Sequence, residues 1–432
     1  MRDIANSSLR DLFIYQVYVR NHTKAGTFKA LLKDLDRIKS MGVDMIYLLP
    51  IHPIGEKNRK GTLGSPYAIK DYFAINEELG TMEDFDLLIE TAHQKGLKVM
   101  MDIVYNHTSP DSTLVSKHPE FFYQVDGQFK NRIGEWWDVI DFDYSKDERL
   151  SDILIDALAF YTEKGVDGFR FDVPSLLPYD FLAKAKKHIK TINPNTIWLS
   201  ESVHGHFLKE VRDRGFEGLS ESELFSIFEL AYDYDAHPYL EAYLKGEGSL
   251  SAYTDWLMKQ EEIYPQDYIK MRNLENHDFG RIAGFLNQNE AKLDQWHAFN
   301  FFNKGATMIF SGTESYNPHH PSLFDKDTID FTIKDKQPYF KKLHQHTTGK
   351  LFCDGAYQVK TLANGATIQA QYRLENQTVI GLFNVGLAEG QTEVNIPDGT
   401  YQNVLNEQTL SVTNGKLTLS KEPVIIYLNK EK

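Results

Sequence analysis

Short apolar stretches alternate with amphipathic stretches from the start of the chain to about residue 350. The apolar stretches are typical of buried strands, and the stretches between them repeat apolar residues at helical spacing. Strands that alternate with helices pair in parallel through right-handed crossovers, so this pattern predicts an α/β fold. The predicted strands are residues 13–19, 45–49, 97–104, 168–171, 197–199, 228–232, 268–274 and 307–310.

Local signals mark where the predicted helices begin and end. A helix over 28–41 is closed by Gly42, Thr81 can cap a helix over 82–95, and a helix over 150–164 ends at Gly165. Eight strand-helix units fit a (β/α)8 TIM barrel with insertions. A doubly wound open sheet is the alternative, and its dinucleotide-binding version is disfavoured because no Gly-rich phosphate motif follows the first strand.

The chain has 432 residues, too many for one small core. The pattern of apolar and polar residues changes at two places along it. Residues 108–147 form a polar insertion after the third strand. From residue 351 the chain shows short alternating runs with turn signals at Asn364-Gly365, Asp398-Gly399 and Asn414-Gly415, which predict hairpins of an antiparallel β domain. The predicted domains are the barrel (1–107 and 148–350), the insertion (108–147) and the C-terminal β domain (351–432).

Composition narrows the classes of partner. The formal net charge of -14 argues against nucleic acid or an anionic membrane surface, and a neutral substrate fits better. No apolar run approaches the roughly 18 residues that a membrane helix needs. The start of the chain carries Arg2, Asp3 and Arg10 and has no secretory-signal pattern, so with Met1 as the natural start we expect a cytoplasmic protein. The single cysteine, Cys353, excludes an intramolecular disulfide.

Charged and polar side chains cluster where the predicted strands end. In a parallel barrel all these ends lie at one rim, where active sites form. In the strand 168–172, Arg170 and Asp172 share one face, and burial requires that they be paired. A structural ion pair is the plain alternative. The strand ends that offer carboxylates or histidines are residues 102–107, 170–172, 199–201 and 273–278.

Carboxylates gathered at one rim suit glycoside hydrolysis. One acid protonates the leaving oxygen, and a second attacks the anomeric carbon or activates water. A hydrolytic metal site built from Asp, Glu and His is the competing chemistry. The absence of an HExxH motif or a comparable pair at helical spacing disfavours it.

Taken together, the strand ends resemble the α-amylase family of glycoside hydrolases. Residues 102–107 (DIVYNH), 168–172 (GFRFD), the strand end at Glu201 and 276–278 (NHD) are similar to the four signature regions of that family, in the family's order. Further similarity covers nearly the whole chain. The resemblance implies that residues 108–147 correspond to the short domain B and that the tail from about residue 350 corresponds to the β-sandwich domain C.

The resemblance also implies a role for each matched residue. Asp172 corresponds to the nucleophile, Glu201 to the general acid/base and Asp278 to the third acid, which holds the reacting sugar. The other matched residues would support Asp172 or bind that sugar. They are Tyr67, His107, Arg170 and His277.

The sequence departs from the family pattern at a few positions. Residues 173–176 (VPSL) follow the nucleophile position where calcium-dependent members have a Lys-His pair, although Asn106 keeps a position that is often a calcium ligand. We therefore expect that no cofactor is required, and the resemblance leaves a calcium site possible but in doubt. Pro66 replaces the usual Gly before Tyr67, and Val173 is a residue seen in α-1,6-acting members.

The sequence thus predicts a retaining α-glycoside hydrolase that acts on α-glucans such as maltooligosaccharides or starch fragments. A 4-α-glucanotransferase or an α-1,6-glucosidase of the same family is the alternative. A non-catalytic binding member is disfavoured because none of the three acids is lost. The expected partner is the oligosaccharide substrate, with no nucleic acid and no membrane.

Overall fold

Eight parallel strands close into a barrel in the computed structural model, which describes residues 7–429. Around the barrel the strands follow the order β1-β12-β11-β10-β9-β8-β3-β2. The predicted TIM barrel is confirmed, and the open-sheet alternative is wrong. The strands are β1 (Phe13–Val17), β2 (Met45–Leu48), β3 (Lys98–Ile103), β8 (Gly168–Phe171), β9 (Ile197–Ser200), β10 (Leu230–Tyr232), β11 (Lys270–Arg272) and β12 (Ala306–Phe310).

The barrel strands are buried on both faces, which explains why they are apolar without strict alternation. Phe169 and Phe171 of β8 join the core between strands and helices, as their position on one face of the strand predicts. Arg170 lies between them in sequence and is fully buried, on the inward face with Asp172. The barrel interior is filled by a separate cluster that includes Met100 and Leu199.

Helices surround the barrel, and the signals at their ends are partly confirmed. Thr81 forms the predicted cap of α4 (Met82–Gln94), and the Asp84 carboxylate accepts a hydrogen bond from the Thr81 N–H. The single helix predicted over 28–41 is wrong, because two helices, α2 (Phe28–Leu32) and α3 (Leu35–Ser40), are separated at Lys33 and Asp34. The Asp34 carboxylate is held there by His22 and Arg37, a contact that the sequence did not reveal.

The helices of the described chain have these bounds: α1 (Val19–His22), α2 (Phe28–Leu32), α3 (Leu35–Ser40), α4 (Met82–Gln94), α5 (Thr113–Lys117), α6 (Arg149–Glu163), α7 (Tyr179–Ile192), α8 (Gly205–Asp213), α9 (Glu221–Leu224), α10 (His237–Leu244), α11 (Leu250–Ile263), α12 (Ile282–Phe285), α13 (Glu290–Phe302), α14 (Gln337–His346) and α15 (Lys350–Asp354). Across residues 7–429, none of them combines the length and the apolar character needed to cross a membrane.

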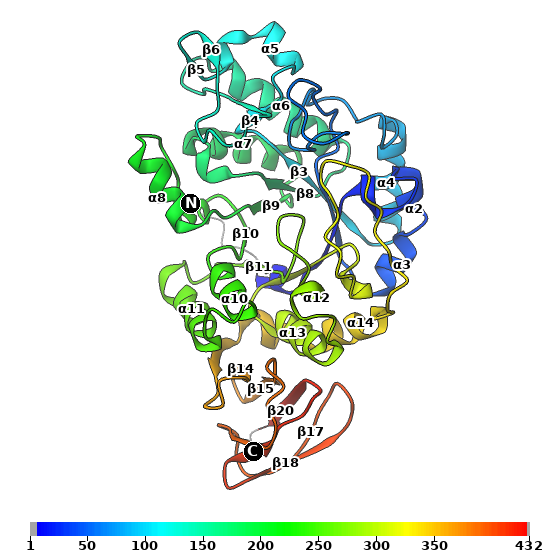
Figure 1. Ribbon diagram of the computed structural model, residues 1–432, viewed down its shortest axis with the longest axis vertical. Helices are drawn as coiled ribbons and strands as arrows, with labels where there is room; N and C mark the ends of the chain where they lie inside the picture. The colour runs from blue at the N-terminus through cyan, green and yellow to red at the C-terminus, as the bar shows by residue number, and fades with distance from the viewer. Residues whose placement is uncertain (1–6, 430–432) are drawn as a thin grey trace.

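The insertion between β3 and α6 projects from the barrel at the end opposite the C-terminal sheets (Figure 1). Its strands are very short, and β4 pairs with β7 while β5 pairs with β6. The pairing of His107 with Asp141 ties the insertion back to the end of β3. The strands are β4 (His107–Thr108), β5 (Gln124–Val125), β6 (Gln128–Phe129) and β7 (Ile140–Asp141).

The C-terminal region forms two antiparallel four-stranded sheets, in the orders β13-β14-β15-β20 and β16-β19-β18-β17. This confirms the predicted antiparallel β fold, whereas the exact domain limits stay predictions, and residues 1–6 and 430–432 lie outside the described residues. The strands are β13 (Ala356–Thr361), β14 (Ile368–Leu374), β15 (Gln377–Phe383), β16 (Gln391–Glu393), β17 (Gly399–Gln402), β18 (Thr409–Thr413), β19 (Lys416–Thr418) and β20 (Val424–Asn429).

Two of the three predicted hairpin turns are present in these sheets. Asn364-Gly365 joins β13 to β14, and Asn414-Gly415 joins β18 to β19. The hairpin at Asp398-Gly399 is wrong, because β16 and β17 lie at opposite edges of their sheet. Asp398 instead accepts hydrogen bonds from the N–H groups of Asn414 and Gly415, each at 2.8 Å, and so stabilises the neighbouring turn.

An aromatic cluster joins the barrel to the first C-terminal sheet. Phe302, at the end of α13, has its ring centre 5.5 Å from that of Phe352, 5.5 Å from that of Tyr372 and 5.4 Å from that of Phe383. Phe302 is fully buried, so its contacts remove apolar surface of both the barrel and the C-terminal sheet from water.

Replacement of Phe302 by alanine therefore leaves a cavity at the junction. We expect Phe302→Ala to lower the free energy of unfolding by about 3–5 kcal/mol, measured by denaturant unfolding followed by tryptophan fluorescence. Phe285→Ala, at a phenylalanine that is 37% exposed in α12, is the matched control, and its effect should stay within about 0.5 kcal/mol. Equal effects of the two substitutions would contradict the packing described.

Candidate active site

The guanidinium of Arg170 lies at the centre of a buried cluster of acids at the barrel mouth. Its Nη1 is 2.8 Å from Oδ1 of Asp102 and 3.0 Å from Oδ1 of Asp172, and its Nη2 is 2.9 Å from Oε2 of Glu201. The three acids come from the neighbouring strands β3, β8 and β9. Burial of so many charges is tolerable only because the arginine pairs with all of them.

The sheet register brings Asp172 and Glu201 side by side. Phe171 pairs with Ser200, so the acids that follow them leave neighbouring strands at the same level. The Glu201 N–H donates to the carbonyl oxygen of Phe171 at 3.1 Å, which extends the ladder to this point. Backbone hydrogen bonds therefore fix the positions from which both side chains enter the site.

Val173 supplies an additional hydrogen bond to Glu201 from an unusual backbone conformation. Its φ of 36° lies in the left-handed region, which is costly for a β-branched residue. In this conformation the Val173 N–H donates to Oε2 of Glu201 at 2.8 Å. The strained turn after β8 thus orients the carboxyl group that arises from β9.

Burial acts on the protonation of both acids. It raises the pKa of Asp172 to about 7 and raises the pKa of Glu201 well above its usual value, while the Arg170 charge opposes both shifts. Because the shift is upward for both and the two charges repel, one proton is retained on the pair near neutral pH, and we assign it to Glu201. The site can then present one protonated acid beside one carboxylate.

Two predicted sugar-binding residues lie against the acids as a stacked pair. The rings of Tyr67 and His277 are 5.5 Å apart and nearly parallel, with the Tyr67 hydroxyl oxygen 2.6 Å from Nε2 of His277. The same hydroxyl donates to Oδ2 of Asp102 at 2.8 Å. His107, the third predicted sugar-binding residue near the acids, has its Nε2 3.8 Å from Oδ2 of Asp172.

Both histidines act as neutral groups in this site. Burial lowers the pKa of His107 to about 4 and that of His277 to about 4. At neutral pH each imidazole therefore carries a single ring proton and can exchange hydrogen bonds with a neutral ligand without adding charge.

Asp278 is the more open acid of the site. Its side chain is 39% exposed, whereas that of Asp172 is 10% exposed. The Tyr234 hydroxyl donates to its Oδ2 at 3.1 Å, and Asn276 donates to that hydroxyl at 2.9 Å. The structure thus brings all seven predicted site residues to one end of the barrel.

Sequence reasoning missed two members of this cluster. Asp102 stood among the strand-end residues but was given no role, although a single acid inside the otherwise apolar end of β3 was a usable signal. Tyr234 follows β10, the strand with the weakest sequence pattern, and a tyrosine in a chain with 23 of them carries little information by itself.

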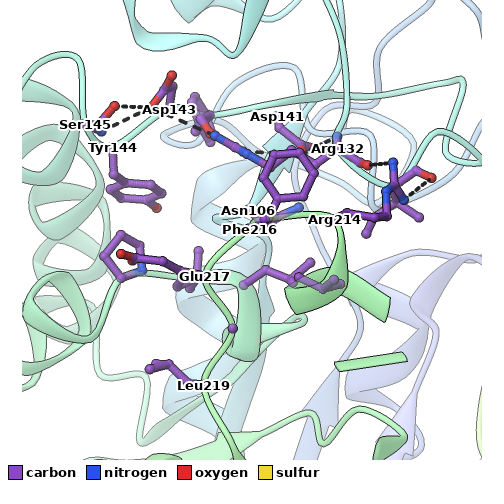
Figure 2. Close-up of a pocket in the computed structure, with 18 of the residues that line it drawn as sticks. Asn106, Arg132, Asp141, Asp143, Tyr144, Ser145, Arg214, Phe216, Glu217 and Leu219 are labelled. Atoms are coloured by element: carbon purple, nitrogen blue, oxygen red, sulfur yellow. Dashed lines mark hydrogen bonds and ion pairs between the residues drawn. The ribbon is translucent and has the colours of Figure 1, made fainter. Parts of the chain in front are cut away.

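An arginine side chain lies beside Asn106, the residue at the possible calcium position. Beside Asn106, the Arg132 guanidinium lies 3.4 Å from Oδ2 of Asp141 and donates to the carbonyl oxygen of Phe142 at 2.8 Å (Figure 2). The arginine cation thus pairs with Oδ2 of Asp141, whereas the buried Oδ1 of the same carboxylate has no hydrogen-bond partner among the described residues. Within residues 7–429 no group of three or more His, Cys, Asp or Glu side chains is arranged for a metal. Independence of activity from calcium stays a prediction.

The cavity shown in Figure 2 is separate from the acid cluster. It has a volume of about 350 Å³ and lies between the insertion, the turn after β8 and the segment after α8. Arg132, Arg214 and Phe216 line it, and neither Asp172 nor Glu201 does. Arg214 donates to the carbonyl oxygens of Arg132 and Ile133, which ties the insertion to the segment after β9.

The closed barrel and its buried carboxylates define a (β/α)8 enzyme of the kind that acts on glycosidic bonds. The family model described as alpha amylase, catalytic domain, matches residues 13–342, and the model for the bacterial alpha amylase C-terminal domain matches residues 358–426. The chain therefore belongs to the α-amylase family, as an enzyme of the glycoside hydrolase or transferase type.

Known proteins similar to this chain include hydrolases and transferases. An α-amylase from Lactobacillus plantarum is 41% identical over 98% of this chain and 100% of that one, with a TM-score of 0.94. A maltogenic α-amylase from Thermotoga neapolitana is 32% identical over 98% of this chain and 100% of that one, with a TM-score of 0.87. The α-1,4-glucan:maltose-1-phosphate maltosyltransferase of Picrophilus torridus is 31% identical over 51% of this chain but only 39% of its own length.

Removal of the central cation should destabilise the fold in a pH-dependent manner. Arg170→Ala leaves three buried carboxylates without their cation, at a cost of about 3–5 kcal/mol. Their folded-state pKa values then lie further above the unfolded values of about 4, so stability is lost as pH rises above that value. The drop in melting temperature relative to wild type should be larger at about pH 8 than at about pH 5.

Arg170→Lys is the matched control for this prediction. It keeps the positive charge and loses only the fork that reaches several acids, so it should recover part of the lost melting temperature. An equal loss for Arg170→Ala at both pH values would show that the cation does not balance the acids.

Proposed function

We propose that this protein is a retaining α-glycoside hydrolase that acts on α-glucans, with maltooligosaccharides or starch fragments as substrates. The observation that carries the proposal is the pair Asp172 and Glu201, held by one arginine on neighbouring strands. Paired strands lie about 4.8 Å apart. That spacing suits the roughly 5–5.5 Å between carboxyl groups of retaining enzymes better than the wider gap of inverting ones.

In the first step, Glu201 gives its proton to the glycosidic oxygen as the bond from that oxygen to the anomeric carbon breaks. Asp172 attacks the same carbon from the opposite face and forms a glycosyl ester. The raised pKa of Glu201 supports its role as the acid, because it keeps the proton available near neutral pH. Arg170 stabilises the Asp172 carboxylate, the form that can attack.

In the second step, Glu201 acts as a base. It takes a proton from water, the water oxygen bonds to the anomeric carbon, and Asp172 leaves as a carboxylate. Two inversions give net retention of the α configuration. If a sugar hydroxyl replaces water, the same step transfers the glycosyl unit instead.

The remaining residues of the cluster would bind the reacting sugar. Asp278 is open enough to accept hydrogen bonds from sugar hydroxyls, and neutral His107 and His277 can donate to them. Tyr67 presents an aromatic ring next to these groups, a suitable surface for the apolar face of a pyranose.

Similar proteins support α-glucans as the substrate class, and their names include both hydrolases and transferases. Two similar structures are named α-amylases, which favours hydrolysis. The curated relatives named maltosyltransferases favour a 4-α-glucanotransferase as the second candidate. An α-1,6-glucosidase is the remaining alternative, and it rests only on Val173.

The assigned roles predict a loss of turnover without a loss of fold. Asp172→Asn removes the nucleophile and Glu201→Gln removes the acid, so each should reduce kcat on maltooligosaccharides by several orders of magnitude. Asp255→Asn, on the exposed face of α11, is the matched control and should leave kcat unchanged. If Asp172→Asn kept activity within about tenfold, a barrier change of only about 1.4 kcal/mol, the nucleophile assignment would be wrong.

The double displacement predicts the anomer of the first product. Proton NMR spectra recorded immediately after addition of enzyme to maltotriose should show the α-anomer at the new reducing end, before mutarotation adds the β-anomer. Early β-anomer would refute the mechanism. Disproportionation with almost no new reducing ends would favour the glucanotransferase.

A further inference from the structure

Two consecutive tryptophans in the insertion, Trp136 and Trp137, are not part of the acid cluster. Trp137 is 55% exposed, more than any other large apolar side chain described between residues 7 and 429. Scattered exposed apolar residues are ordinary, but a pair of indoles beside a sugar site is a candidate ligand surface. The contacts of the two rings show which parts of the barrel mouth they face.

Trp136 faces the loop that follows β9. Its ring centre lies 5.3 Å from that of His107 and 6.5 Å from that of Phe207, and its plane is tilted only 26° from the Phe207 ring. Phe207 belongs to α8, six residues after Glu201. Trp136 and Phe207 therefore form an aromatic surface on the Glu201 side of the site.

Trp137 faces the loops that follow β2 and β12. The Lys60 ammonium nitrogen lies 5.5 Å from the centre of the Trp137 indole and 5.9 Å from the centre of the Phe324 ring. The same ammonium pairs with Oδ1 of Asp138 at 2.7 Å. These contacts hold the indole at the junction of three loops while more than half of its surface stays exposed.

The order of strands places these two loop groups across the barrel mouth from each other. In the closed barrel β1 lies opposite β9, and β1 has β2 and β12 as its neighbours. The loops that carry Lys60 and Phe324 therefore lie on the far side of the mouth from Phe207. Consecutive residues of the insertion thus turn toward opposite sides of the reacting centre.

The chemistry of the acid identifies the two sides. Glu201 must lie beside the oxygen that it protonates, so the leaving part of the chain extends on the β9 side. The part that becomes attached to Asp172 then extends toward the β2 and β12 loops. Neutral pyranose rings present apolar faces that stack on aromatic side chains, and the negative charge of this chain does not oppose such a ligand.

We propose that Trp137 binds glucosyl units on the transferred side of the bond and that Trp136, with Phe207, binds those on the leaving side. This inference rests on the proposed function and extends it, because the balance between the two surfaces selects which bond of a maltooligosaccharide is cut. The leaving-side surface also receives acceptor sugars in transfer.

The test is the position of cleavage in maltoheptaose labelled with a chromophore at its reducing end, read by chromatography of the labelled products. Trp137→Ala weakens binding on the transferred side, so cleavage should move toward the non-reducing end. Trp136→Ala and Phe207→Ala should both move it toward the reducing end. We expect the ratio of neighbouring cleavage products to change about fivefold to tenfold, the size of one aromatic contact.

Two controls separate this reading from damage to the fold. Trp137→Phe keeps a stacking ring and should shift the pattern less than Trp137→Ala. Tyr427→Ala removes an aromatic ring that is 42% exposed on β20, in the C-terminal sheet, and should leave the pattern unchanged. Melting temperatures identify any variant that fails to fold. If Trp136→Ala is such a variant, Phe207→Ala alone reports on the leaving side.

The outcomes distinguish the inference from the proposed function. Shifts in opposite directions for Trp137→Ala and for Trp136→Ala or Phe207→Ala support the inference. Unchanged patterns, or shifts in one common direction, overturn it while hydrolysis by the wild type leaves the proposed function intact. A wild-type enzyme that does not act on maltoheptaose overturns both.

Discussion

The buried pairing of Arg170 with acids from three barrel strands is the interaction on which the site depends. Asp172 and Glu201 are too deeply buried to coexist near each other without a cation, and Asp102 adds a third carboxylate behind them. The guanidinium balances this charge and, because it is planar, also sets the relative positions of the acids. The hydroxyls of Tyr47 and Tyr67 take up the remaining acceptor capacity of Asp102.

This arrangement links catalysis to backbone geometry rather than to flexible side chains. Asp172 and Glu201 enter from paired strands, and the left-handed turn at Val173 directs an N–H at Glu201. The loops at the mouth of the barrel are not fixed by the sheet register in this way. The insertion supplies both indoles, and residues that follow β2 and β9 contact them, so these contacts can differ without a change in the reacting centre.

Much of the barrel and its rim could be predicted because the information is local. Phe169, Arg170, Phe171 and Asp172 show by alternation alone which side chains enter the site, and the carboxyl ends of parallel strands always meet at one rim. The contacts of Arg170 with Glu201 and of Tyr234 with Asp278 could not be predicted in detail, because they depend on the register between neighbouring strands and on side-chain conformations that the sequence does not specify. The hairpin at Asp398 failed for a similar reason, since the dipeptide does not specify which strand lies next in the sheet.

The central claim is that Asp172 forms a covalent bond to the sugar and that Glu201 is needed to break it. Mass spectrometry of Glu201→Gln after incubation with α-glucosyl fluoride tests this most directly, because fluoride leaves without help from an acid whereas water must be deprotonated before it attacks. We expect the protein to gain the mass of one glucosyl residue and peptide mapping to place that mass on Asp172. The absence of an adduct from a folded variant that releases fluoride, or an adduct on another residue, would contradict the account.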